Sequence, residues 1–161
     1  MPVRSRPNVM PYLAQLSNAE GESHTDYRYE TDGSNAFVYV VDSGLNWGDD
    51  IFNYHPVMVN DVNVVNDEDE DDVTDYDGAG TNVAALAAGK YMGVTSEAKL
   101  GVIKVTFPGS IDGQTEQNLF SRQSVAHGAM AALDDIVDNS RQKSSVICLS
   151  LRKYIVHTDF S

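Results

Sequence analysis

The stretch VYVVDSG, residues 38–44, decides the fold of this chain. An apolar run is followed here by an acid, a small hydroxyl residue and a glycine, which is typical of a buried parallel strand and the loop after it. Asp42 then lies just past the carboxyl end of the strand, where open α/β sheets place their binding sites. We therefore expect a site around Asp42 and Ser43, formed together with residues from other parts of the chain.

Strands and helices alternate along the rest of the sequence. The segments 56–65, 100–105 and 145–151 are rich in β-branched and apolar residues and predict three further strands. Residues 82–88 and 116–139 predict helices. This alternation predicts an α/β fold, with a mostly parallel sheet and helices on both faces.

Details of the two predicted helices can also be expected from the sequence. Thr81 is a good N-cap for the first helix, and Gly89 is a plausible terminator. The second helix carries apolar residues at i, i+4, i+7 and i+11, so that they form one face: Ala126, Met130, Leu133 and Val137.

Length and composition limit the classes of function. The chain has 161 residues, which suggests one domain over 1–161, with a polar N-terminal extension at 1–34 packing on it. Its net charge of −13 argues against nucleic acid and anionic membranes as partners. No signal-peptide pattern and no membrane span are visible, so we expect a cytoplasmic protein, or a secreted one if the native N-terminus was removed. Cys148 is the single cysteine, which excludes an internal disulfide.

An acidic loop is expected at residues 66–77. Its consecutive carboxylates repel one another and favour a solvated loop. Calcium binding is the alternative, since hard cations take several carboxylate oxygens, although the spacing matches no EF-hand loop. The candidate ligands are Asp71, Asp72, Asp75 and Asp77. No other cofactor is expected.

Three motifs in order resemble one protein family. Residues 38–44 resemble the catalytic-aspartate strand of subtilisin-like serine proteases, and residues 78–84 (GAGTNVA) resemble their histidine motif, Gly-His-Gly-Thr-His-Val-Ala. Residues 146–151 resemble the strand of this family that ends in Ser-Leu-Gly-Gly. The chain is thus similar to the N-terminal half of a subtilase of the fungal proteinase K group. The resemblance implies a truncated subtilisin-like fold with strand order 2-3-1-4.

Departures from the family pattern bear on activity. The catalytic histidine falls on Ala79 and the second motif histidine on Asn82. The chain reaches Ser161 before the family's oxyanion asparagine and nucleophilic serine, so Asp42 would be a vestigial triad aspartate. We expect a pseudoprotease that acts by binding, with a small molecule or a peptide as its ligand.

Other functions remain open. One alternative is a non-proteolytic enzyme that takes a small molecule in a pocket lined by Asp42, Ser43, Ala79, Asn82, Ser150, Leu151 and Arg152. Another is a gene product with no function of its own. The histidines have no evident catalytic role: His24, His55, His127 and His157.

The strand from Val146 to Leu151 is expected at the edge of the sheet. An unpaired apolar edge invites pairing with another chain. A homodimer is favoured, since two-fold dimers are the commonest oligomers. A partner chain that completes the sheet, or coverage by residues 154–160, are the alternatives. Arg152 and Lys153 replace the family's glycines and could attract an acidic partner.

Overall fold

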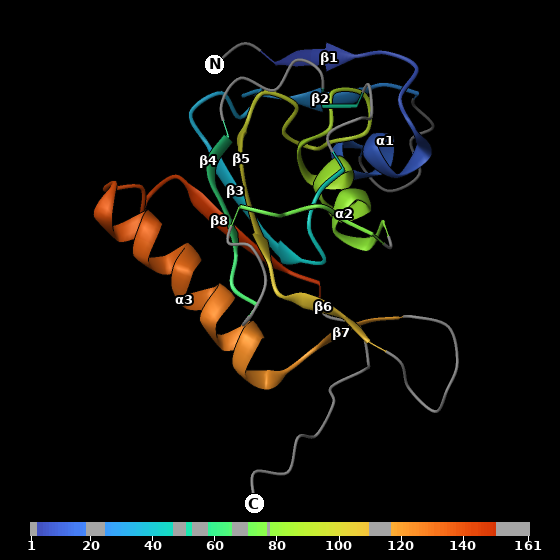
Figure 1. The fold of residues 1–161 in the computed structure, drawn as a ribbon. Coiled ribbons are helices and arrows are strands. Elements are labelled where there is room, and N and C mark those ends of the chain that lie inside the picture. The colour runs from blue at the N-terminus through green and yellow to red at the C-terminus, as the bar shows by residue number, and fades with distance from the viewer. Residues whose placement is uncertain are drawn as a thin grey trace, which may run out of the picture.

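The computed structural model describes residues 3–18, 25–46, 51–52, 58–65, 71–76, 78–109 and 117–150, and for residues 58–61, 107–109 and 117–120 it describes the backbone alone. The centre of the fold is a parallel sheet with the order β4-β5-β3-β8 (Figure 1). Its strands are β3 (Phe37–Asp42), β4 (Met58–Asn63), β5 (Lys99–Lys104) and β8 (Ser145–Leu149). With the four strands numbered along the chain, this order is 2-3-1-4.

One helix lies on each face of the sheet, so the predicted α/β architecture is present (Figure 1). Helix α2 (Ala79–Ala88) packs on one face and α3 (Arg122–Asp138) on the other. The side chains of β3 alternate between the two faces of the sheet. Val38 and Val40 pack on the face covered by α2, whereas Tyr39 and Val41 pack on the face covered by α3. Of the helices in the described ranges, none combines the length and hydropathy that a bilayer span requires.

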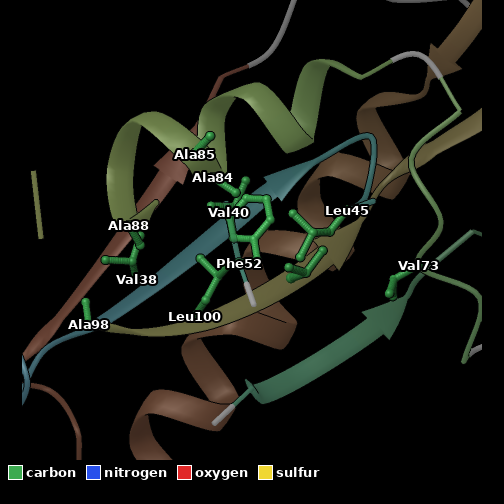
Figure 2. Close-up of a cluster of buried hydrophobic side chains, with 11 residues drawn as sticks. Val38, Val40, Leu45, Phe52, Val73, Ala84, Ala85, Ala88, Ala98 and Leu100 are labelled. Atoms are coloured by element: carbon green, nitrogen blue, oxygen red, sulfur yellow. The ribbon is translucent and has the colours of Figure 1, made fainter. Parts of the chain in front are cut away.

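Small side chains bring α2 close to the sheet. Its buried positions include Ala84, Ala85 and Ala88, which pack on Val40 and Leu100 in one apolar cluster. Figure 2 shows the alanines of α2 beside the side chains of the central strands. The helix ends where predicted, with Gly89 as its C-cap. The N-terminus of α2 is therefore held at the carboxyl end of β3.

Helix α3 is shorter than predicted at its N-terminus. The chain forms a strand, β7 (Gln117–Phe120), which pairs antiparallel with β6 (Thr106–Gly109). The helix starts at Arg122 because Ser121 and Ser124 form a reciprocal capping box. Ser121 accepts from the Ser124 amide at 2.9 Å, and Ser124 accepts from the Ser121 amide at 3.0 Å.

The face of α3 that packs on the sheet is not its most apolar face. The buried row is Ser124, Gly128, Ala132 and Ile136, whereas Met130, Leu133 and Val137 are exposed. A Cβ at Gly128 would lie 2.3 Å from Val105 and 2.9 Å from Val41, so only small residues allow this approach. The apolar face at positions 126, 130, 133 and 137 is thus left outside the core, contrary to the usual packing of such a face.

The N-terminal elements bind to the end of α2. They are β1 (Arg4–Arg6), α1 (Pro11–Ser17) and β2 (Tyr27–Tyr29), of which β1 and β2 pair antiparallel. The Arg6 guanidinium lies 5.3 Å from the Tyr27 ring centre and donates to the carbonyl of Gly93 at 2.7 Å. The Tyr12 hydroxyl donates to the carbonyl of Met92 at 2.7 Å. These contacts fix the loop that follows α2.

Candidate functional site

Asp42 and Ser43 lie buried at the carboxyl end of β3, with 6% and 1% of their surface exposed. The Ser43 amide donates to Asp42 Oδ1 at 2.8 Å. The Asp42 carbonyl accepts from the Val105 amide at 2.9 Å, and its register partner on β5 is Lys104. The aspartate is therefore held on a central strand, as the sequence predicted for the position that follows the apolar run.

The N-terminus of α2 meets this strand end directly. The Gly80 amide donates to Ser43 Oγ at 2.8 Å. A Cβ at Gly80 would lie 2.3 Å from the carbonyl oxygen of Gly44, so two backbones touch here. Since consecutive Cα atoms are about 3.8 Å apart, Ala79 lies next to the Asp42–Ser43 corner. Structure and sequence thus bring Asp42, Ser43 and Ala79 together.

Asp75 connects the strand end to the helix. Its Oδ1 accepts from Ser43 Oγ at 2.8 Å and from the Gly78 amide at 3.0 Å. Its Oδ2 accepts from the amide and the hydroxyl of Thr81, at 2.8 and 2.6 Å. Burial acts to raise the pKa of Asp75, but the hydrogen bonds from Thr81, Ser43 and Gly78 prevail and hold it below the ordinary value of 3.8.

The prediction of Thr81 as an N-cap is wrong. Helix α2 begins at Ala79, with Gly78 as its N-cap at φ 81°. Asp75 supplies the acceptor that an N-cap side chain would normally provide, and both the amide and the hydroxyl of Thr81 donate to it. That hydroxyl accepts from the Asn46 amide at 2.9 Å and ties the loop after β3 to the helix.

The carboxylates of Asp72 and Asp75 are occupied by protein donors. Besides the four bonds to Asp75, Asp72 Oδ1 accepts from the Thr74 amide at 3.0 Å and Asp72 Oδ2 from the Tyr76 hydroxyl at 3.3 Å. Among the residues that the structure describes, there is no group of three or more metal-ligating side chains. Asp77 lies outside those residues, so the calcium site stays a prediction.

Two other predicted pocket residues lie at the surface. Asn82 is exposed on α2, and its amide donates to the Gly78 carbonyl at 3.0 Å. Ser150 is exposed just after β8, and the pairing of Val41 with Leu149 puts it level with Asp42. The predicted pocket residues Leu151 and Arg152 lie outside the described part of the chain.

Two buried polar residues near the site were not singled out from the sequence. Lys104 is 2% exposed at the end of β5, with its ammonium 5.0 Å from the ring centre of Tyr76. Thr106 is 5% exposed, and in the described structure its Oγ1 has no hydrogen-bond partner. Lys104 could have been identified from the sequence as a charged residue at the end of a central strand, level with Asp42. Nothing in the sequence marks Thr106.

The sequence of this chain is similar to that of one known protein family. A sequence model of the subtilase family matches residues 33–157. Alkaline protease 1 of Emericella nidulans is 32% identical over 133 residues, which cover 82% of this chain and 29% of that protein. Subtilisin-like proteinase Mp1 of Magnaporthiopsis poae is 30% identical over 141 residues, covering 86% of this chain and 32% of that protein. The chain thus spans about a third of these relatives.

A solved structure has the same fold. It is a cold-adapted subtilisin-like serine proteinase with a TM-score of 0.65 and 25% sequence identity. The match covers 89% of this chain and 46% of that one. The arrangement of the sheet and its two helices therefore has a counterpart in a known proteinase.

Proposed function

The chain belongs to the subtilase family, and from this premise we propose that it acts by binding a ligand and does not cleave peptide bonds. The observation that carries the proposal is Ala79. In the family's Gly-His-Gly-Thr-His-Val-Ala motif, the catalytic histidine corresponds to this residue. The residue after it, Gly80, donates its amide to Ser43 Oγ at 2.8 Å, which supports a position for Ala79 beside the strand end that carries Asp42.

Peptide cleavage by a serine protease needs a base that takes the proton of the nucleophile. The aspartate of a triad orients the imidazole and stabilises its charge, so Asp42 cannot replace it. A methyl group at position 79 accepts no proton. Of the described residues, His127 is the only histidine, and it is exposed on α3, on the face of the sheet opposite to α2. These facts support the loss of proteolysis.

A hydrolysis assay tests this proposal. The full chain is incubated with casein and with fluorogenic peptides, alongside the Asp42→Ala variant prepared in the same way. We expect the same background rate from both proteins. Turnover by the native chain that disappears in Asp42→Ala would overturn the proposal, whereas turnover shared by both samples would reveal a contaminating protease.

A second candidate function is small-molecule chemistry at the carboxyl end of β3, where Ala79 stands in place of the family's histidine. The observation that favours it is Thr106, whose buried Oγ1 has no hydrogen-bond partner within the described structure and could bind a ligand. Its neighbour Val105 is bonded to the Asp42 carbonyl, so the hydroxyl belongs to the same end of the sheet. A ligand here would be small and polar, with a donor for the Asp42 carboxylate.

Imidazole is a suitable probe for this site, because it is the group that Ala79 lacks. We expect millimolar imidazole to raise the melting temperature of the native chain. The shift should be lost in Ala79→His, which fills the space, and reduced in Asp42→Asn, which removes the charge. Equal shifts in all three proteins would show binding elsewhere and would contradict a site beside Ala79.

A further inference from the structure

We propose that Lys104 is the buried counter-ion of Asp42, a positioning residue that holds this carboxylate in its charged form at the candidate site. The proposal does not depend on the proposed function, because both residues are buried within the described part of the chain and no ligand takes part. It rests on the register of two strands, the burial of the two side chains, and the segment that covers them.

The register of the two central strands places Lys104 and Asp42 side by side. Strands β3 and β5 are neighbours (Figure 1), and Asp42 is the direct partner of Lys104 in their parallel pairing. Paired residues share a face, as Val40 and its partner Val102 do in the cluster under α2. Two residues further along, Asp42 and Lys104 return to that face on neighbouring strands, which lie about 4.8 Å apart.

Both side chains are withdrawn from water. Lys104 is 2% exposed and Asp42 is 6% exposed. Burial disfavours the charged form of each group, so an unpaired ammonium would lose its proton and an unpaired carboxylate would gain one. An opposite charge in the adjacent position prevents this. Each of the two groups therefore stabilises the charged form of the other.

The segment 71–76 covers the end of β5 that carries Lys104. Asn63, the partner of Lys104 on β4, donates its side-chain amide to a backbone carbonyl of this segment at 3.1 Å. At its other end the segment is bonded to the loop after β3 through Asp75. Between these two attachments lies the ammonium of Lys104, 5.0 Å from the ring centre of Tyr76. The cover keeps the ammonium out of water and close to the sheet.

Asp72 is a competing partner for Lys104. Its pKa is lowered first by its hydrogen bonds from Thr74, and the positive charge of Lys104 makes a smaller contribution. The carboxylate of Asp72 is partly exposed, so water screens this attraction. Asp72 is thus the weaker partner, and the buried Asp42 is the main one.

At this end of the sheet, Lys104 is the one cation among the residues that the structure describes. Helix α2 contains no charged residue, and the position level with Asp42 after β8 is Ser150. The segment 71–76 brings three titratable groups: Asp72, Asp75 and Tyr76. The Asp75 carboxylate is compensated by four hydrogen bonds from protein donors, and its charge repels that of Asp42. A cation next to Asp42 is therefore needed to keep both carboxylates ionised.

The test is the pKa of the Asp42 carboxyl group, followed by carbon-13 NMR of the full chain over a pH titration. The variant is Lys104→Met, which removes the charge and keeps an unbranched side chain. The matched control is Lys99→Met, because Lys99 lies at the opposite end of the same strand and its ammonium is also near an aromatic ring, 4.9 Å from that of Phe37. Circular dichroism establishes that each variant is folded.

We expect the pKa of Asp42 to rise by at least about one unit in Lys104→Met and to stay at its native value in Lys99→Met. Loss of packing at Lys104 would lower stability without changing this pKa, so the shift separates a positioning role from a structural one. A pKa of Asp42 that is the same in the native chain and in Lys104→Met would overturn the proposal.

A reciprocal measurement keeps the proposal testable if Lys104→Met does not fold. Coupling between two sites is mutual, so the loss of Asp42 should lower the pKa of Lys104 by a similar amount. The pKa of Lys104 is followed by NMR in Asp42→Asn and in Asp72→Asn. We expect the larger fall in Asp42→Asn. An equal or larger fall in Asp72→Asn would assign the ammonium to Asp72 and overturn the proposal.

Discussion

Asp75 is the residue on which the geometry of the candidate site depends most. Its carboxylate receives hydrogen bonds from the loop after β3 and from the first turn of α2. The sequence offered it as a member of an acidic loop or as a calcium ligand. Neither interpretation predicted that Asp75 joins the loop after β3 to α2, because its partners Ser43 and Thr81 are 32 and 6 residues away in the chain.

Asp75→Asn should therefore lower the stability of the whole domain. An amide has one acceptor oxygen where the carboxylate has two, so buried donors of Thr81 or Ser43 lose their partner. We expect the free energy of unfolding in urea to fall by about 3 kcal/mol. Asp134→Asn, which removes an exposed carboxylate on α3, is the control and should change stability little. Equal effects would contradict the role given to Asp75.

The same carboxylate should make stability depend on pH. The folded pKa of Asp75 is lowered, so its contribution is fully present above the unfolded value of about 3.9 and is lost as the pH falls through the folded pKa. The native chain should lose stability between about pH 4 and the folded pKa more steeply than Asp75→Asn. Urea unfolding at a series of pH values measures this difference, and parallel curves would refute it.

At the scale of elements, the four sheet strands and both covering helices could be predicted from apolar runs and periodicity. Patterns in the local sequence gave wrong predictions at two places where contacts between distant residues determine the structure. The face of α3 that contains Gly128 packs on the sheet in place of the apolar face, because only small residues approach the sheet closely enough. Residues 117–120 were predicted as helix but form a strand that pairs with β6. The local sequence does not indicate this partner.

The contact between α2 and the loop after β3 leads to a prediction with an internal control. Gly80→Ala places a Cβ 2.3 Å from the Gly44 carbonyl oxygen, so backbone must move, and we expect a loss of about 3 kcal/mol. Gly78→Ala meets nothing within 4 Å but keeps φ at 81°, which costs about 1 kcal/mol. Thermal or urea unfolding should rank the two in this order. The reverse order would mean that α2 does not touch Gly44.

At the scale of the whole molecule, the family and the position of Asp42 could be found from the sequence, because motif order survives at about 30% identity to relatives. The residues that surround Asp42 could not be found from the sequence. Buried Lys104 ends β5 and buried Thr106 begins β6, and only the folded sheet brings them to the end that carries Asp42. The exposure of Met130, Leu133 and Val137 likewise depends on which side of α3 packs inward.

The proposed function depends on position 79 lying next to the carboxylate of Asp42 without the imidazole that this carboxylate would orient. Its most direct test is the imidazole pKa of Ala79→His, followed by NMR titration. We expect this pKa to lie above the ordinary value of about 6.5 and to fall when Asp42→Asn is added, since the carboxylate favours the charged ring. A pKa at the ordinary value that does not respond to Asp42→Asn would show that position 79 does not lie next to this carboxylate.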